Sequence, residues 1–210
     1  MTTTICNMIV NSKRGGDGLN ICSVILAGGQ SSRMGTNKAL LPLHGKTVIE
    51  HISEELQAIS DHLVIVANHP SDYQFLGVPI FRDRYKNRGP LAGIETVMYH
   101  TDADFYVIAA CDMPFINRKI YTWLLEQLHD FMAVIPMLDQ QIHPLTGIYH
   151  RRTLPYIQHQ LEKNELQVKR LLKRIKVNYV TDFPDIPIEQ VQRHFFNMNH
   201  PDEYEEAKSY

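Results

Sequence analysis

The chain has 210 residues, of which 44% are hydrophobic and 21% charged, and its formal net charge at pH 7 is −2. This length and apolar content suffice for one substantial core, so we expect a single α/β domain. The small net charge excludes a general attraction to nucleic acid or membrane surfaces, which leaves small molecules as the expected partners. Three cysteines without a C-x-x-C pair indicate neither a disulfide framework nor a structural zinc site, and no apolar stretch has the length of a membrane span. We therefore expect a cytoplasmic location.

Residues 1–20 are polar and lack a hydrophobic period. We expect a flexible N-terminal tail over 1–20 and one folded domain over 21–210. A basic arm for a partner is the alternative, but Asp17 dilutes the charge of Lys13 and Arg14.

The segment after the tail, ICSVILAGGQSSRMGTNKALLPL, changes from an apolar strand into a glycine loop. Gly28 and Gly29 have no Cβ, so the backbone can turn sharply and bring its N–H groups close to an anion. Arg33 and Lys38 follow and supply positive charge for phosphate oxygens. The pattern predicts a polyphosphate site, and a surface turn with solvated cations is the alternative.

Two better-known phosphate loops do not fit this spacing. Gln30 interrupts the G-x-G-x-x-G pattern of dinucleotide-binding folds. The Gly45-Lys46 pair lacks the earlier glycine of a Walker loop, because Leu40 occupies that position.

Downstream, helical patterns alternate with short apolar runs, which is typical of strands joined by crossover helices. We predict helices over 47–60, 90–100, 117–129, 151–162, 165–174 and 201–208. We predict strands over 21–27, 62–67, 78–82, 104–110, 131–137, 142–150 and 176–181. Ligands of open α/β sheets bind beyond the carboxyl ends of the strands. Polar or glycine residues lie just there, namely Gly28, Asn68, Asp83 and Asp112.

Asp112 belongs to the segment Cys-Asp-Met-Pro, directly after a buried apolar run. Mg²⁺ needs only one or two protein carboxylates, because water and substrate phosphates complete its octahedron. Asp112 is therefore a candidate magnesium ligand. A turn or helix N-cap ahead of Pro114 is the alternative.

Two further segments carry weaker signals. Phe81-Arg82-Asp83 is followed by a glycine-flanked helix start, Gly89 to Ile94, whose small residues leave room for a flat base or for close packing of helix and sheet. The segment 197–204, Asn-Met-Asn-His-Pro-Asp-Glu-Tyr, would alone be only a capped final helix.

Together, LAGGQSSRMG…K, RD…GPLAGI, CDMP and NMNHPDEY resemble the molybdenum cofactor guanylyltransferase family of bacteria over about residues 20 to 208. The resemblance implies a Rossmann-like, three-layer nucleotidyltransferase fold with a mostly parallel mixed sheet. It also implies that Asn68 lies near the guanine, that Asp83 belongs to the nucleotide pocket and that Asp112 binds Mg²⁺. The implied GTP-binding residues of the loop are Leu26, Ala27, Gly28, Gly29 and Lys38, and the residues toward the pterin are His143, Asn197 and Asn199. One position departs from the family, which often has Asp before the loop lysine, whereas Asn37 stands here and is expected only to hydrogen-bond.

The resemblance implies transfer of GMP from GTP to the phosphate of molybdopterin, with release of pyrophosphate and with Arg33, Lys38 and Asp112 as the catalytic residues. Transient contact with molybdenum-insertion proteins or molybdoenzyme chaperones would fit this role. A cytidylyltransferase, a sugar-phosphate nucleotidyltransferase and a non-catalytic nucleotide-binding protein are the alternatives. The basic residues of 169–176 form a solvated helix face without interleaved aromatics, so we expect no nucleic acid partner.

Overall fold

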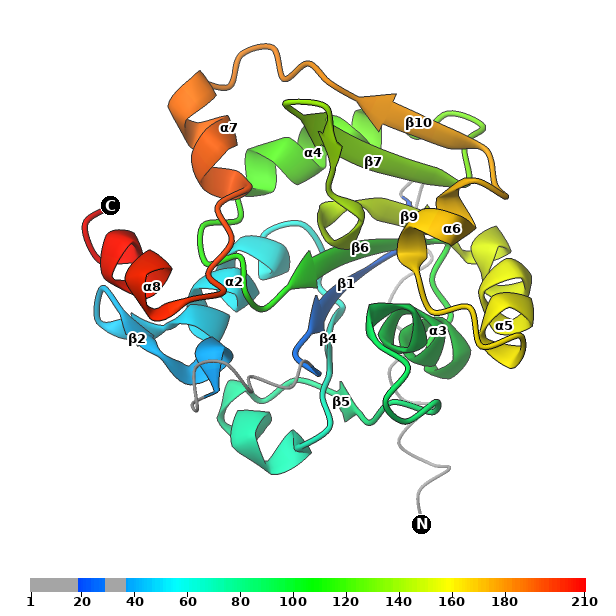
Figure 1. The fold of residues 1–210 in the computed structure, drawn as a ribbon, viewed down its shortest axis with the longest axis horizontal. Helices are drawn as coiled ribbons and strands as arrows, with labels where there is room; N and C mark the ends of the chain where they lie inside the picture. Colours follow the sequence, from blue (N-terminus) through cyan, green and yellow to red (C-terminus); the bar gives the residue numbers. More distant parts are fainter. Residues whose placement is uncertain (1–18, 29–36) are drawn as a thin grey trace.

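An eight-stranded sheet forms the middle layer of the computed structural model, which describes residues 19–28 and 37–210 (Figure 1). The main strand order is β10-β7-β9-β6-β1-β4-β5, and β8 pairs with β7. Among the described strands of this sheet, only β8 and β9 run antiparallel to their neighbours. The strands are β1 (Ile21–Leu26), β4 (Leu63–Val66), β5 (Ile80–Phe81), β6 (Phe105–Ala110), β7 (Ala133–Leu138), β8 (Gln141–Ile142), β9 (Ile148–His150) and β10 (Val177–Val180).

Helices cover both faces of this sheet, so the architecture has three layers (Figure 1). Successive strand residues point to opposite faces, and the central strand β1 therefore contributes to two separate cores. Val24 and Leu26 pack with α3 (Pro90–His100), α5 (Leu154–Glu162) and α6 (Val168–Leu172). Ile25 and Ala27 belong to the other core, which includes α2 (Val48–Gln57), α4 (Arg118–Glu126), α7 (Ile188–His194) and α8 (Pro201–Ala207).

Local signals fix where two of these helices begin. The carboxylate of Glu50 accepts hydrogen bonds from the backbone N–H and the hydroxyl of Thr47, both at 2.6 Å, and this capping box starts α2. Gly89 precedes α3 with φ of 69°, a left-handed conformation that costs glycine little, and Pro90 then supplies the first helical residue.

Short elements complete the chain. The 3-10 helices are η1 (Lys38–Leu40), η2 (Pro70–Leu76), η3 (Pro144–Thr146) and η4 (Arg151–Thr153). The strands β2 (Pro42–Leu43) and β3 (Lys46–Thr47) form a small hairpin apart from the main sheet. None of the helices in the described segments combines the length and the hydrophobicity that a membrane span requires.

The mixed, mostly parallel sheet confirms the predicted fold class. Each predicted helix corresponds to an observed one, α3 with the predicted ends and the others with shifted ends. The predicted strand 142–150 is wrong, because Pro144 begins η3 and separates β8 from β9. Helix α7 and the β2–β3 hairpin were not predicted. The tail predicted over 1–20 lies outside the described residues except for Leu19 and Asn20.

Candidate active site

The carboxyl ends of β1, β4, β5 and β6 meet at one edge of the sheet, because these strands are parallel. Backbone hydrogen bonds continue the ladder one residue beyond the strands, from Ala27 N to Val66 O at 2.8 Å and from Ala67 N to Phe81 O at 2.9 Å. Cys111 N likewise donates to Leu26 O at 3.2 Å. The residues that follow these strands are thereby brought to one edge, as the sequence predicts for Gly28, Asn68, Asp83 and Asp112.

Gly28, Asn68 and Asp83 form the first group at this edge. The Asn68 side-chain amide donates to the carbonyl oxygen of Gly28 at 3.0 Å. A Cβ added to Gly28 would lie 3.4 Å from Asp83 Oδ2 and 3.5 Å from Asn68 Nδ2. The missing side chain therefore leaves a space between an amide and a carboxylate.

Asp83 lies between this loop and the beginning of α3. A Cβ added to Gly93 would lie 3.6 Å from Asp83 Oδ1, so the carboxylate is close to glycine on both sides. Burial raises the pKa of Asp83 above its usual range. Neither carboxylate oxygen accepts a hydrogen bond from another described side chain, which leaves both as acceptors for a ligand.

The second group begins with Lys38, the first residue of η1. Asn37 caps this short helix, because its Oδ1 accepts from Ala39 N at 3.2 Å. Asn37 Nδ2 also lies 2.9 Å from the hydroxyl of Tyr73. Asn37 thus makes hydrogen bonds, as predicted, and burial raises the pKa of Tyr73 to about 12, so its phenol is neutral.

The C-terminal segment contacts both Lys38 and Asp112, although it is distant in sequence. Lys38 Nζ donates to Asn199 Oδ1 at 3.3 Å, and Met198 N donates to the carbonyl oxygen of Asp112 at 2.8 Å. The Glu203 carboxylate accepts from the backbone N–H of Asn199 and, at 2.7 Å, from that of His200. These bonds bring Lys38, Asp112 and Asn199 together and hold the segment before α8.

Asp112 has the properties expected of a magnesium ligand. Burial, and to a lesser extent the negative charge of Glu203, raise the pKa of its carboxyl group, while the charge of Lys38 opposes this shift. Its hard carboxylate oxygens suit Mg²⁺. Among the described residues no three or more His, Cys, Asp or Glu side chains are grouped so that they could hold a metal ion.

The neighbouring thiol is not a nucleophile. Burial, together with the charge of Asp112, raises the pKa of Cys111 to about 12. The thiol is therefore protonated at neutral pH, whereas a nucleophilic cysteine is a thiolate.

His143 and Asn197 lie farther along the structure. The His143 backbone N–H donates to Pro136 O in β7 at 2.9 Å, and its ring lies 4.3 Å from that of Phe195, centroid to centroid. Asn197 is exposed and follows Phe195 by two residues. Within the described segments no hydrogen bond or ion pair joins His143 or Asn197 to Lys38 or Asp112.

Gly29 and Arg33 lie outside the described residues. Leu26 and Ala27 are buried at the end of β1, each 9% exposed, so their backbone rather than their side chains borders the edge. Two residues that support the site were not predicted, namely Tyr73 and Glu203. Nothing in the sequence links Tyr73 to Asn37, 36 positions away, whereas the spacing of Glu203 from His200 is that of a capping box.

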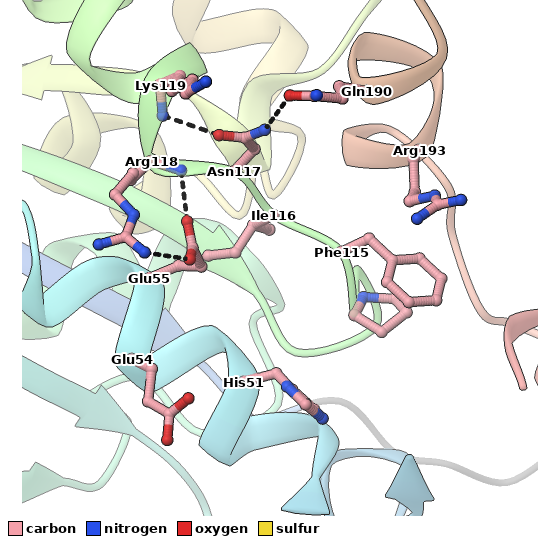
Figure 2. A pocket seen from close by; sticks show the side chains of 11 residues that line it. His51, Glu54, Glu55, Phe115, Ile116, Asn117, Arg118, Lys119, Gln190 and Arg193 are labelled. Carbon is pink, nitrogen blue, oxygen red and sulfur yellow. Dashed lines mark hydrogen bonds and ion pairs between the residues drawn. The ribbon is translucent and has the colours of Figure 1, made fainter. Parts of the chain in front are cut away.

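A groove of about 490 Å³ lies between α2, the segment 114–119 and α7 (Figure 2). Asn117 bonds to Gln190 across it, and the carboxylate of Glu55 contacts Arg118. None of the predicted site residues lines this groove. The chemistry of the sheet edge is therefore separate from it.

Comparison with known proteins shows the family of the chain. The family model of the MobA-like NTP transferase domain matches residues 23–179. A probable molybdenum cofactor guanylyltransferase of Carboxydothermus hydrogenoformans is 38% identical over 188 residues, which cover 89% of this chain and 94% of the relative. A protein of the same name from Bacillus cereus is 36% identical over 196 residues, with 88% and 94% covered.

A solved structure shares the fold as well. The crystal structure of molybdopterin-guanine dinucleotide biosynthesis protein A from Archaeoglobus fulgidus matches with a TM-score of 0.76 and 25% identity, covering 89% of this chain and 96% of that one. The chain therefore belongs to the molybdenum cofactor guanylyltransferase family of MobA-like nucleotidyltransferases.

Proposed function

We propose that the protein transfers GMP from GTP to the terminal phosphate of molybdopterin, which releases pyrophosphate and forms the guanine dinucleotide. The observation that carries this proposal is the convergence of Lys38, Asp112 and Asn199 beside the space between Gly28, Asn68 and Asp83. Lys38, Asp112 and Asn199 offer a cation, a carboxylate and an amide for phosphates. Asn68 and Asp83 offer hydrogen-bonding groups for a base. The names of the relatives in the two bacteria support the same reaction.

The reaction that fits this site is an in-line displacement. An oxygen of the acceptor phosphate forms a bond to the α-phosphorus of GTP, and the bond from that phosphorus to the bridging oxygen of the leaving pyrophosphate breaks. The acceptor phosphate is already ionised at neutral pH, so no general base is needed. Alignment and neutralisation of charge supply most of the catalysis in such transfers.

Lys38 neutralises negative charge on the phosphates and the departing pyrophosphate, and the hydrogen bond to Asn199 orients its ammonium group. Gly28 lets the nucleotide approach the backbone at the end of β1. Arg33 and the backbone of Gly29 are proposed to bind the same phosphates.

Asp112 would hold Mg²⁺, and the ion would supply Lewis-acid stabilisation of the phosphate oxygens when bound. Asp112 suits this task because its carboxylate lies beside Lys38, which orients the same polyphosphate. The hydrogen bond from Met198 N to the backbone carbonyl oxygen of Asp112 ties the backbone of Asp112 to the C-terminal segment.

Asp83 and Asn68 are proposed to select the guanine base. A carboxylate only accepts hydrogen bonds, and the Watson–Crick edge of guanine presents two donors, N1–H and the N2 amino group. The corresponding edge of cytosine lacks this pair of adjacent donors. Asp83 therefore favours GTP over CTP, provided that its carboxyl group is ionised.

His143, Asn197 and Asn199 are proposed to face the pterin. The charge of Lys169 acts on His143 and, after burial, is the second cause of its lowered pKa. A cation near this end of the site suits an anionic acceptor. We also propose a cytoplasmic location, where the described cysteines, Cys22 and Cys111, remain free thiols.

A nucleotide competition assay tests the function. Purified protein is incubated with Mg²⁺, molybdopterin and molybdate, and pyrophosphate release is followed with GTP, CTP or ATP in parallel. Release with GTP alone supports guanylyl transfer. Release that is fastest with CTP moves the protein to the cytidylyltransferases, and tight GTP binding without release supports a non-catalytic role.

A further inference from the structure

The Asp83 carboxylate is proposed to bind the guanine base, and this requires that it be held in one direction. Within the described residues no hydrogen bond holds its carboxylate, so its direction depends on the backbone around it. The next residue, Arg84, is held by α3 at three points. We propose that Arg84, Glu95 and Tyr99, here called the Arg84 brace, position Asp83 for recognition of the guanine base.

The first contact is made by the backbone. Arg84 N donates to Thr96 Oγ1 at 3.0 Å, which ties the peptide after Asp83 to the side of α3. Two residues before Asp83, the carbonyl oxygen of Phe81 accepts a hydrogen bond from the backbone N–H of Ala67, which follows β4. The four-residue segment from Phe81 to Arg84, which carries Asp83, is thus attached at both ends.

The second and third contacts are made by the guanidinium group. It forms an ion pair with the carboxylate of Glu95, whose side chain is 0% exposed. Its Cζ atom also lies 3.3 Å from the centroid of the Tyr99 ring, as in a cation–π contact. Arg84 is therefore clamped between a buried charge and an aromatic face.

Glu95 is itself oriented from a second helix. Gln158 Nε2 on α5 donates to the same oxygen, Glu95 Oε1, at 2.9 Å. The other oxygen, Oε2, is buried and has no hydrogen-bond partner in the described part of the chain. Burying a carboxylate with one unsatisfied oxygen is unfavourable, and desolvation offsets much of the attraction in a buried ion pair.

The location of this costly pair favours a positioning role over a contribution to stability. It lies next to Asp83, and Gly93, which approaches the Asp83 carboxylate, is two residues before Glu95 on the same helix. The brace therefore fixes the Asp83 carboxylate relative to α3. This inference rests on the proposed function, because it requires that Asp83 face the base.

Binding of two nucleotides tests the brace without the pterin. Inosine triphosphate lacks the N2 amino group of GTP, so the ratio of the two Kd values reports the contact with Asp83. With Mg²⁺ present, calorimetry should show that Glu95→Gln weakens GTP binding about tenfold and inosine triphosphate binding by less than about twofold. Asp83→Ala should remove the preference for GTP over inosine triphosphate. Adding Glu95→Gln to Asp83→Ala should not change the ratio of the two Kd values any further.

Two further variants distinguish positioning of Asp83 from a general disturbance of the fold. Tyr99→Leu changes a half-exposed ring and should reduce the ratio in the same direction, even if Glu95→Gln fails to fold. Glu165→Gln disrupts another Arg–Glu ion pair, between Glu165 in the loop after α5 and Arg174 just beyond α6, and should leave the ratio at the wild-type value.

The brace is overturned if Glu95→Gln or Tyr99→Leu folds and keeps the wild-type ratio while Asp83→Ala loses it. An unchanged ratio in Asp83→Ala would overturn both the brace and the role of Asp83 in reading the base. Guanylyl transfer to molybdopterin by the wild-type protein is measured separately, so failure of the proposed function remains distinguishable.

Discussion

Gly28 determines how closely a nucleotide can approach the end of β1. Its missing Cβ faces Asn68 and Asp83 at distances of ordinary van der Waals contact, and its backbone is not in a left-handed conformation. Gly147 is different, because a Cβ there would lie 2.6 Å from Ile135 Cδ1 and 2.9 Å from the backbone oxygen of Val134. Two glycines therefore serve different purposes, ligand access at one and close packing at the other.

Alanine substitutions separate these purposes. Gly28→Ala should change the free energy of unfolding by less than about 1 kcal/mol, because the fold has room for a methyl group there. It should nevertheless raise the KM for GTP about tenfold or more, since the methyl group fills the space between Asn68 and Asp83. Gly147→Ala should lower the free energy of unfolding by about 2 kcal/mol through overpacking. Urea unfolding and steady-state kinetics measure both, and a strongly destabilised Gly28→Ala would contradict the argument.

Asp112 is the residue on which the proposed metal role depends. Asp112→Asn keeps the shape of the side chain but removes the charge that Mg²⁺ requires, so kcat should fall by about a hundredfold or more. The fold should persist, because the backbone carbonyl of Asp112 still accepts from Met198. Titration of activity with Mg²⁺ checks this, and turnover equal to that of the wild type would refute the metal role.

Among the elements, those with a simple hydrophobic pattern were predictable from the sequence. β1, β4 and β6 are uninterrupted apolar runs, and the site residues follow from the rule that ligands bind beyond the ends of parallel strands. Strand 142–150 was predicted wrongly, because tertiary structure places Pro144 in a 3-10 turn. Glu95 lies within a helix where a charged residue is expected to be exposed, and its partners Arg84 and Gln158 explain its burial. Contacts of this kind join distant residues and leave no local pattern.

Helix α7 contains a buried histidine that makes stability depend on pH. Burial, assisted by the neighbouring His143, lowers the pKa of His194 to about 3, and its Nδ1 accepts from Asn117 N at 2.8 Å. Below about pH 6.5 the unfolded chain binds a proton that the folded chain does not bind, so this histidine costs stability as the pH falls toward 3. The loss approaches about 1.4 kcal/mol per pH unit in this window.

Replacement of His194 tests this coupling. His194→Gln should unfold more easily at pH 7, because a buried ring contact is lost, yet its stability should decrease less steeply between pH 6.5 and 5 than that of the wild type. Chemical unfolding at several pH values measures the two slopes. Equal slopes would show that His194 does not contribute to the acid sensitivity.

At the scale of the whole molecule, the C-terminal segment packs against residues that follow Lys38 and Asp112 in the sequence. Tyr204 in α8 donates to Pro42 O at 2.6 Å, and Tyr210 contacts the ring of Phe115 at 5.2 Å between centroids. The β2–β3 hairpin, which follows Lys38, and the segment after Asp112 are thereby linked through the C-terminus (Figure 1). The motifs that follow β1, β4, β5 and β6 meet at one sheet edge because these strands are parallel. The C-terminal segment reaches the same edge through its hydrogen bonds to Lys38 and Asp112.

The fate of the α-phosphorus tests the central claim most directly. The protein is incubated with Mg²⁺, molybdopterin and molybdate, together with GTP labelled at either the α- or the γ-phosphorus. The pterin product is then isolated, and its label and its mass are measured. Guanylyl transfer predicts that the α-label enters a product heavier by one GMP unit while the γ-label leaves in pyrophosphate. A product that carries the γ-label, or an unmodified pterin with intact GTP, would contradict the account.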